Sequence, residues 1–394
     1  MKITGYRYET YTMKLDRPIA DCNLPEGLDL LPGSVLFIET DEGVEGVSLG
    51  FGIEGVSALF HLIEGEDPRE VVSLWAKIND YIHKVGNEGA ANGALSSIDI
   101  ALWDLKGKLA EEPLWRTLGA AEGRVKAYAS GLDYCLTDDE LFAFYRRMAE
   151  RGIDGGKLKV GLDIEADTRR LGIMHEALSI ASDRPQLMID SNEYWSPKQA
   201  VRFIRRIEEQ FDLAWAEEPA RRWDYAGLRL VSEQVSAAVA TGENLNSVAD
   251  FYPLIANQAV DVLNVAAGHS GITGCRQIAH LAHVYGLPVS MMNCQAEFMA
   301  HAAAALPNHV GMEVVDPGRE QCLRFDSYIE DGYIILSDKP GLGIEVDEKA
   351  LAELQARPPE GRGQFPFARR EGAGRYIVPL RPGEVPWEIS SREP

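Results

Sequence analysis

Two lysines separated by a single residue are the first feature of the chain that points to chemistry. Lys157 and Lys159 stand in the stretch Gly-Lys-Leu-Lys-Val-Gly, and side chains two apart on a strand point to the same side. Like charge disfavours the ionised form, so each ammonium group is expected to lower the pKa of the other. A partly neutral lysine can act as a general base near neutral pH. Taken alone, the pair also fits a solvated strand end.

Three carboxylates follow the lysines, each at the end of a predicted strand. They are Asp190, Glu217 and Glu243, with Asn192 close behind the first. The strand ends of a parallel barrel meet at one mouth, so the carboxylates are expected to converge there. Unpaired anions at short range repel one another. A hard divalent cation relieves that repulsion, and an all-oxygen set with open positions suits Mg²⁺. Any one of these acids alone would more commonly be a salt-bridge partner.

The elements that position these residues repeat along the chain from residue 125. Short apolar strands are predicted at 125–130, 156–160, 186–190, 213–217, 238–243, 260–266, 287–292 and 311–315. Amphipathic helices fill most of the intervals, for example 197–210 and 274–285. Eight strand–helix repeats at this spacing predict a (β/α)₈ barrel with its chemistry at the strand ends.

The remaining segments predict an α+β domain and a C-terminal segment. The expected N-terminal elements are strands at 3–13, 34–40 and 44–50 and helices at 68–85 and 93–110. Residues 16–31, rich in Pro, Gly and Asp, are expected to form a loop. The predicted division is therefore 1–124 for a capping domain, 125–320 for the barrel and 321–394 for a C-terminal segment. In that segment a strand pair near 332–336 is expected to pack on the N-terminal domain, and a loosely ordered tail begins at about 357.

The composition limits the partners and the compartment. The 394 residues carry a formal charge of −22, which argues against nucleic acid or an anionic membrane surface as a partner. An anionic small substrate therefore needs positive charge within its own site. Arg169 and Arg170 lie on a predicted helix and are expected on a solvated face, not in that site. The five cysteines form no Cys-x-x-Cys pair, and neither a membrane-length apolar run nor a signal-like N-terminus is present. These features favour a cytoplasmic protein.

Taken together, the motifs resemble the enolase superfamily, in its mandelate racemase-like subgroup (mandelate racemase/muconate lactonizing enzyme family), over about residues 1–350. The matching stretches are Ser-Ile-Asp-Ile-Ala-Leu-Trp-Asp-Leu-Lys-Gly-Lys at 97–108, Lys-Leu-Lys at 157–159, Asp-Ser-Asn at 190–192, Trp-Ala-Glu-Glu-Pro at 215–219, Thr-Gly-Glu-Asn at 241–244 and Gly-Leu-Gly-Ile-Glu at 341–345. The resemblance implies an α/β fold: a modified (β/α)₇β or (β/α)₈ TIM barrel with an α+β capping domain formed by the N-terminal segment and C-terminal residues. It also implies a homo-oligomer and a loop at 16–31 that helps to close the site.

The resemblance further implies roles for individual residues. The implied Mg²⁺ ligands are Asp190, Glu217 and Glu243. Lys159 is implied to remove the weakly acidic proton alpha to a carboxylate, and the resulting enediolate is stabilised by Mg²⁺ as a Lewis acid. Lys157 is implied to neutralise the substrate carboxylate, and Glu313, at the eighth strand end, resembles the acidic partner that hydrogen-bonds it.

The chain departs from the racemase pattern at two strand ends. Met292 stands where racemases of this subgroup carry a histidine, and Val265 and Ala266 stand where a supporting Asp, or the lysine of muconate-lactonizing relatives, is expected. Inversion needs an acid and a base on opposite faces of one carbon, whereas β-elimination of water needs one base and an acid near the leaving hydroxyl. The departure favours dehydration of an aldonate or aldarate to a 2-keto-3-deoxy acid.

The group that protonates the leaving hydroxyl stays open. The main candidates near strand ends are Tyr134, Tyr194 and His269, which are also candidates for substrate binding beside Asn192 and Glu313. Glu297 and Cys294 follow as candidates for the acid alone. A structural role competes with the functional one for each of them, and Lys159 itself could serve in a syn elimination. The alternative functions are a racemase, epimerase or cycloisomerase that uses the same lysine and Mg²⁺, and a binding protein on an enzyme scaffold.

Overall fold

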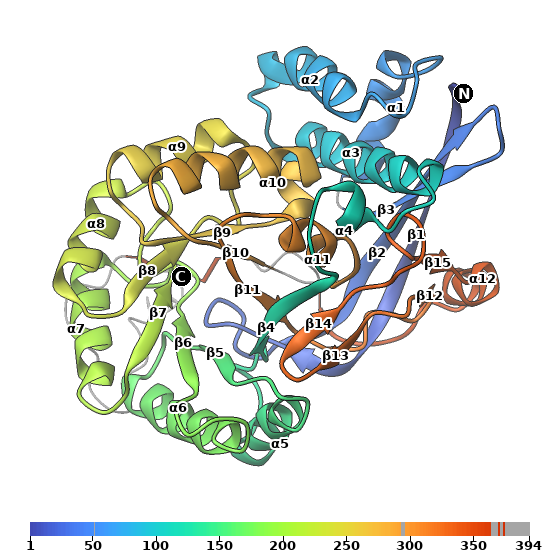
Figure 1. The fold of residues 1–394 in the computed structure, drawn as a ribbon. Helices are drawn as coiled ribbons and strands as arrows, with labels where there is room; N and C mark the ends of the chain where they lie inside the picture. The colour runs from blue at the N-terminus through green and yellow to red at the C-terminus, as the bar shows by residue number, and fades with distance from the viewer. Residues whose placement is uncertain (51, 293–295, 364–368, 371–372, 375–394) are drawn as a thin grey trace, which may run out of the picture.

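A closed ring of parallel strands forms the centre of the molecule (Figure 1). The structure, a computed structural model, describes residues 1–50, 52–292, 296–363, 369–370 and 373–374, without the side chains of 296–298. The strands are β4 (Arg124–Ser130), β5 (Gly155–Lys159), β6 (Gln186–Asp190), β7 (Leu213–Glu217), β8 (Ala238–Thr241), β9 (Val262–Val265), β10 (Val289–Met291) and β11 (His309–Val314). Because β11 also pairs with β4, the ring closes. The predicted barrel is confirmed.

Helices connect the strands and surround the ring (Figure 1). They are α5 (Asp138–Ala149), α6 (Ile164–Leu178), α7 (Pro197–Glu208), α8 (Tyr225–Gln234), α9 (Val248–Ala256), α10 (Ala267–Val284) and α11 (Ala296–Ala304). The start of α7 is encoded locally, since the Ser196 side chain accepts from the Gln199 backbone N–H and Pro197 takes the first turn. By contrast, α10 begins earlier than predicted and is broken at Gly271, whose φ is 68°.

The N-terminal domain is a three-stranded antiparallel sheet packed against helices. Its strands are β1 (Ile3–Ile19), β2 (Leu28–Thr40) and β3 (Glu45–Leu49), and its main helices are α2 (Val71–Ile82) and α3 (Gly89–Leu109). Short helical turns link them: η1 (Ile53–Gly55), α1 (Val56–Leu59), η2 (Phe60–Leu62), η3 (His83–Val85) and α4 (Leu114–Thr117). A glycine is needed at Gly46, because a Cβ there would lie 2.2 Å from the Ala101 carbonyl oxygen of α3.

The predicted loop at 16–31 is wrong in extent. β1 continues to Ile19 and β2 begins at Leu28, so only residues 20–27 lie outside the strands. The ladder between the two strands is irregular between Lys14 and Ile19, and such an irregularity accommodates Pro18 within an extended segment. Arg17 donates to the Val315 carbonyl at 2.5 Å, which anchors the end of β1 to the barrel.

The C-terminal elements contact both parts of the chain. They are β12 (Leu323–Arg324), β13 (Tyr328–Glu330), β14 (Tyr333–Ile335), β15 (Glu345–Val346) and α12 (Glu348–Ala356). β14 pairs with β4 of the barrel, with Tyr333 opposite Lys126. This differs from the expectation that the strand pair packs on the N-terminal domain, because the edge left open at the start of β4 accepts it. The helix α12 does reach the N-terminal sheet, since Gln355 donates to Glu9 at 2.8 Å.

A polar contact joins the N-terminal domain to the barrel between α3 and α10. Thr273 donates to the fully buried Asp99 through its hydroxyl at 2.5 Å and its backbone N–H at 2.9 Å. Trp103 Nε1 donates to the same threonine hydroxyl at 2.9 Å. Burial raises the pKa of Asp99 to about 7. The contribution of this carboxyl group to the free energy of unfolding therefore depends on pH.

Replacing Asp99 by Asn is expected to remove that dependence. Asp99 keeps its proton in the folded state up to about pH 7, whereas in the unfolded chain it ionises near pH 3.9. Its stabilisation is thus complete at low pH and is lost as pH rises towards 7. The free energy of unfolding of the wild type, relative to Asp99→Asn, should fall by roughly 2 kcal/mol between pH 5.5 and 7.5 in urea titrations. A difference that stays constant with pH would show that Asp99 is already ionised.

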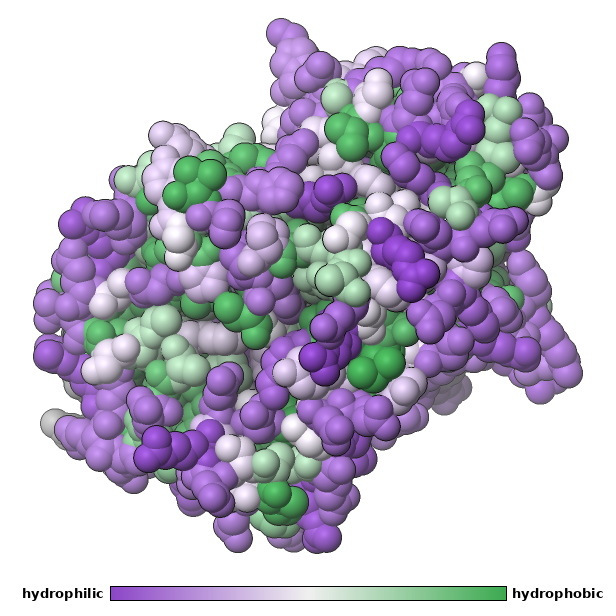
Figure 2. All heavy atoms as spheres, in the orientation of Figure 1, coloured by the Kyte–Doolittle hydropathy of each residue, from purple (hydrophilic) through white to green (hydrophobic). Residues whose placement is uncertain are grey.

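The outer surface is mainly polar. Figure 2 shows hydrophilic residues over most of the visible face, with hydrophobic residues in small separate groups. Among the described residues, no helix combines the length and the apolar character that a membrane crossing requires. The exposed large hydrophobic side chains include Val284, Val85 and Trp223, and isolated exposures of this kind are ordinary.

Candidate active site

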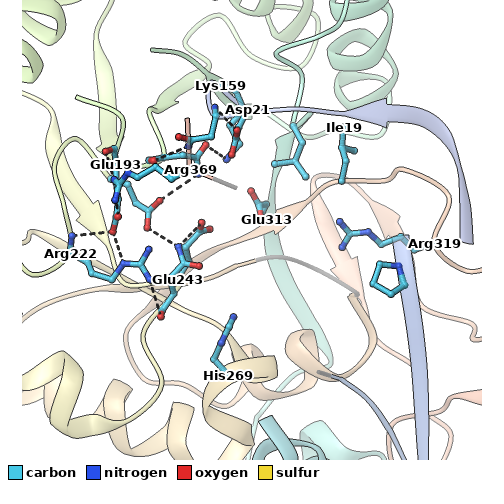
Figure 3. Close-up of a pocket in the computed structure, with 16 residues that line it drawn as sticks. Ile19, Asp21, Lys159, Glu193, Arg222, Glu243, His269, Glu313, Arg319 and Arg369 are labelled. Carbon is cyan, nitrogen blue, oxygen red and sulfur yellow. Dashed lines mark hydrogen bonds and ion pairs between the residues drawn. The ribbon is translucent and has the colours of Figure 1, made fainter. Parts of the chain in front are cut away.

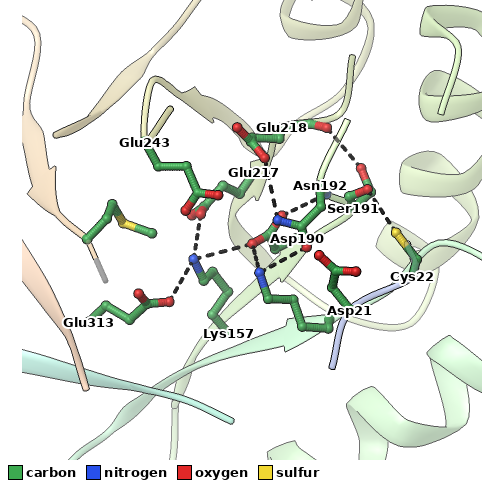
Figure 4. A network of polar contacts seen from close by, with 12 residues as sticks. Asp21, Cys22, Lys157, Asp190, Ser191, Asn192, Glu217, Glu218, Glu243 and Glu313 are labelled. Carbon is green, nitrogen blue, oxygen red and sulfur yellow. Dashed lines mark hydrogen bonds and ion pairs between the residues drawn. The ribbon is translucent and has the colours of Figure 1, made fainter. Parts of the chain in front are cut away.

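The ends of the barrel strands bring Lys157 and the predicted metal ligands to one mouth (Figure 4), and Lys159 Nζ lies 2.5 Å from Asp190 Oδ2 there. The register aligns Lys159 with Asp190 and Asp190 with Glu217 across neighbouring strands. Glu243 follows the next strand, β8, by two residues. Lys157, Asp190 and Glu217 are at most 1% exposed. The predicted convergence of these side chains is confirmed.

Lys157 lies in the interior and bridges several acids. Its Nζ is 2.5 Å from Glu217 Oε1, 3.0 Å from Glu313 Oε1 and 3.5 Å from Asp190 Oδ2. Burial alone lowers the pKa of this lysine, but Glu217 and Glu313 outweigh burial and hold the pKa well above its usual value. Lys157 is therefore a fixed positive charge beneath the site.

The prediction for the acidity of Lys159 is wrong in this structure. Burial and Lys157 both lower its pKa as expected, yet the net direction is upward because Asp190, with Glu243 and Glu313, outweighs them. Lys159 Nζ donates to Asp190 Oδ2 at 2.5 Å and to Asn192 Oδ1 at 2.9 Å. The sequence shows the neighbouring lysine but not how close the carboxylates come.

Negative charge exceeds positive charge at this mouth. The pKa of Glu217 is raised to about 8, mainly by burial, with Asp190 and Glu243 adding to the shift and Lys157 opposing it. Burial likewise raises the pKa of Glu243. For Asp190 burial acts in the same direction, but Lys159 and Lys157 outweigh it and lower the pKa. Crowded, dry carboxylates of this kind fit a hard divalent cation.

The lysines hold the carboxylates apart in this arrangement. Within the described part of the chain, no three Asp, Glu, His or Cys side chains lie close enough to hold a metal as they stand. The Nζ atoms of Lys157 and Lys159 sit among Asp190, Glu217 and Glu313. The assignment of Asp190, Glu217 and Glu243 as ligands rests on the chemistry of the donor set and stays a prediction.

Arg170 was expected on a solvated face, and that expectation is wrong. It is 6% exposed and donates to the Lys159 carbonyl at 3.0 Å and to Asp133 Oδ1 at 3.0 Å. Asp133, fully buried, also accepts from the Lys159 backbone N–H at 3.2 Å and from Tyr145 at 2.6 Å. The helix α6 turns Arg170 inward because this carboxylate pairs with its charge. The pair positions the end of β5, which carries Lys159.

A cavity of about 580 Å³ opens above this network (Figure 3). Five of the predicted site residues line it: Lys159, Asn192, Glu243, His269 and Glu313. Further polar lining residues come from loops and were not predicted as site residues: Asp21, Asn23, Glu193, Glu218, Arg222, Asn244, Arg319 and Arg369. Glu218 and Asn244 belong to matched motifs, whereas no motif marks the others, because loop conformation rather than strand register brings them there.

The structure separates the candidates for the leaving-group acid. Tyr194 is fully buried and Tyr134 accepts from the Leu162 backbone N–H at 3.3 Å, and neither lines the cavity. His269 does line it, on the side away from Lys159 (Figure 3). Burial, with Arg222, lowers the pKa of His269. Cys294 and the side chain of Glu297 lie outside the described residues.

The position expected for a racemase histidine is apolar. Met292 is fully buried just after β10, and Tyr128 donates to its sulfur at 3.1 Å. Val265 and Ala266, at the end of β9, are buried as well. The described residues of these two strand ends therefore contain no acid–base pair, in agreement with the departure read in the sequence.

A TIM-type barrel with carboxylates at three strand ends and a lysine pair on β5 defines a class of enzymes, and comparison with known proteins identifies it. Residues 33–119 match the mandelate racemase / muconate lactonizing enzyme N-terminal domain, and residues 140–350 match the enolase C-terminal domain-like family. The chain belongs to the mandelate racemase/muconate lactonizing enzyme family of the enolase superfamily.

Two curated relatives and one crystal structure show what the chain is similar to. The 3,6-anhydro-alpha-L-galactonate cycloisomerase of Streptomyces coelicolor is 30% identical over 80% of this chain and 90% of its own length. The L-talarate/galactarate dehydratase of Salmonella typhimurium is 33% identical over 79% and 80%. The crystal structure of that dehydratase with Mg and L-lyxarohydroxamate covers 89% of this chain and 92% of its own, at 30% identity and a TM-score of 0.81.

Proposed function

We propose that this protein is a Mg²⁺-dependent dehydratase that converts a polyhydroxylated acid, an aldonate or aldarate, into a 2-keto-3-deoxy acid. One observation carries the proposal: Lys159 lines the cavity, while buried Met292 occupies the place where a racemase has its second base. One base is enough to remove the alpha proton before the β-hydroxyl leaves. The similarity to L-talarate/galactarate dehydratase supports the same reaction.

The donor set of Asp190, Glu217 and Glu243 fits Mg²⁺, since it consists only of carboxylate oxygens in a site with excess negative charge. When bound, Mg²⁺ would stabilise the charge that develops on the substrate carboxylate. The crystal structure of the dehydratase from Salmonella typhimurium contains Mg, which supports this choice of metal. Excess negative charge in a buried cluster also explains why a cation rather than a further side chain is expected here.

The chain's own residues supply proton transfer and orientation. Lys159 takes the alpha proton at Nζ, and it must exchange its contact with Asp190 for other neighbours to become neutral. Glu313 lines the cavity, and Lys157, 3.0 Å from it, supplies positive charge to the substrate carboxylate from beneath. Asn192, which accepts from Lys159 at 2.9 Å, keeps the amine directed at the cavity. A general base must lie within hydrogen-bond distance of the proton that it removes, and this orientation of Lys159 serves that requirement.

The test is product formation from a panel of aldonic and aldaric acids with the purified protein and Mg²⁺. A 2-keto acid, trapped with semicarbazide and measured by absorbance, is the expected product from one acid or a few related ones. Absence of a keto acid from every member of the panel would contradict the proposal.

His269 is proposed as the acid that protonates the leaving hydroxyl, since among the candidates whose side chains are described it is the one that lines the cavity, across from Lys159. His269→Asn should lower kcat for dehydration by about 10²- to 10⁴-fold, while Lys159 still exchanges the alpha hydrogen with D₂O. Burial lowers the pKa of His269, and the imidazole loses its proton as pH rises. The kcat of the wild type should therefore fall with rising pH. His269→Asn should lack this fall in kcat, whereas His280→Asn, on the exposed face of α10, should retain it. Undiminished dehydration in His269→Asn would assign the acid role to Lys159.

A cycloisomerase is the second candidate function, and the relative from Streptomyces coelicolor favours it. Such an enzyme also needs one base and one acid near the same carbons. The mass of the product discriminates between the two functions, because an isomer keeps the mass of the substrate whereas dehydration removes one water.

A further inference from the structure

The chain continues beyond residue 350, where the match to the family ends, and its described residues return to the mouth of the barrel. We call residues 361–363, 369–370 and 373–374 the C-terminal strap. At its start the Arg362 backbone N–H donates to Asp29 Oδ1 at 2.7 Å, and the Arg362 carbonyl accepts from Asp29 and Leu30 at 3.1 and 3.2 Å. The strap thus begins on the first residues of β2.

The other end of the strap lies on loops that follow β6 and β7. Gly374 N–H donates to the Tyr194 carbonyl at 2.6 Å, and Arg221 donates to the Ala373 carbonyl at 2.5 Å. Ala373 is 2% exposed. Backbone groups of the strap therefore bond to the N-terminal domain and to the barrel, on two sides of the cavity.

Asn23 connects the strap to the proposed base. Its Oδ1 accepts from the Arg370 N–H at 3.1 Å, and its Nδ2 donates to the Asn192 carbonyl at 3.2 Å. The Asn192 side chain in turn accepts from Lys159 Nζ at 2.9 Å. Two hydrogen-bonded side chains thus separate the strap from the reacting amine.

Arg369 is the strap residue that lines the cavity (Figure 3). Its Nη2 donates to the Glu193 carbonyl at 2.6 Å and lies 3.3 Å from Glu193 Oε2, while Arg222 Nε donates to Oε1 of the same buried glutamate at 2.6 Å. Arginine has five donors, and both contacts recorded among the described residues use Nη2. Among the described residues Nε and Nη1 contact no partner, which leaves these donors for a ligand.

We infer that the C-terminal strap completes the substrate cavity and that Arg369 is a specificity-determining residue, which binds an anionic or hydroxyl group of the substrate away from its reacting carboxylate. The substrate class rests on the proposed function; the docking of the strap does not. Acidic side chains such as Asp21, Glu193 and Glu218 line the same cavity, so an anionic substrate requires compensating charge on that side. A guanidinium with donors to spare meets this requirement.

The specificity role is tested with Arg369→Gln in the full chain. For an acid that the wild type turns over, KM should rise about tenfold or more, while kcat changes less than about threefold, because the contact is made in both ground and transition states. The increase should be larger for a diacid than for a monoacid of the same carbon number. Arg229→Gln is the matched control, since Arg229 is exposed on α8 and does not line the cavity; its KM should stay unchanged. A KM for Arg369→Gln equal to that of the wild type overturns the role.

The docking of the strap is tested by hydrogen exchange in the wild-type protein without substrate. The amides of Arg370 and Gly374, which donate to Asn23 and Tyr194, should exchange at least about tenfold more slowly than in an unstructured peptide. Exchange at the unstructured rate overturns the inference whatever the enzyme does. Slow exchange with no turnover of any acid supports the docked strap and instead counts against the proposed function.

Discussion

Lys159→Ala is expected to lower the rate of dehydration by about 10³-fold or more and to abolish exchange of the alpha hydrogen in D₂O. Lys159 is the lysine that lines the cavity, whereas Lys157 is fully buried and bonded to Glu217 at 2.5 Å, so the second amine cannot replace the first. General-base catalysis accounts for a factor of about 10² to 10⁴ in rate. The effect should appear in kcat rather than KM, because the proton is transferred only in the transition state.

The same substitution weakens the fold, so the stability of the variant must be measured beside its activity. Removing Lys159 takes away the 2.5 Å partner of buried Asp190, although Lys157 remains 3.5 Å from it. Loss of one member of a buried pair costs about 3–5 kcal/mol. Lys198→Ala, an exposed lysine on α7, is the control and should keep full activity. A folded Lys159→Ala protein that still dehydrates its substrate would refute the assignment of the base.

Glu243→Gln is expected to abolish Mg²⁺-dependent turnover with little loss of stability. Glu243 lines the cavity, and glutamine keeps its shape while removing a negative charge that the cation requires. Loss of several kcal/mol of charge stabilisation corresponds to roughly 10³-fold or more in kcat. Chelation of the metal in the wild-type protein should produce the same loss, and added Mg²⁺ should restore activity.

Metal binding can be followed without turnover. Mg²⁺ binds the folded state, so the Tm of the wild type should rise progressively with Mg²⁺ concentration, and Glu243→Gln should lack this increase. Glu176→Gln, an exposed acid on α6, should behave as the wild type. If Glu243→Gln retains both the Mg²⁺ shift in Tm and its activity, Glu243 is not a ligand.

The sequence predicts this site well where strand register alone determines it. The strands at 186–190 and 213–217 agree with β6 and β7 to the residue, and their last residues are the acids Asp190 and Glu217. Parallel pairing then brings these acids together with Lys159, because neighbouring strand ends share one edge. The residue pattern of each strand and the order of the strands along the chain can both be read from the sequence, and they are enough to place these residues together.

Features that depend on tertiary distance could not be read from the sequence. The burial of Arg170 follows from Asp133, which lies 37 positions away, and the raised pKa of Lys159 follows from its 2.5 Å contact with Asp190. Asp21 and Arg369 reach the cavity from loops, where no period constrains the direction of a side chain. The pairing of β14 with β4 depends on which strand edge is open, and local propensity does not encode it.

The fate of the substrate in D₂O with Mg²⁺ tests the central claim most directly. Proton NMR follows the alpha position and mass spectrometry follows the loss of water for each aldonic or aldaric acid. The account predicts that a substrate loses one water and yields a 2-keto-3-deoxy acid with deuterium at C3. Two results would contradict dehydration: deuterium at the alpha carbon without loss of water, or a product that is an isomer of the substrate. Either would make the protein an isomerase that uses the same lysine.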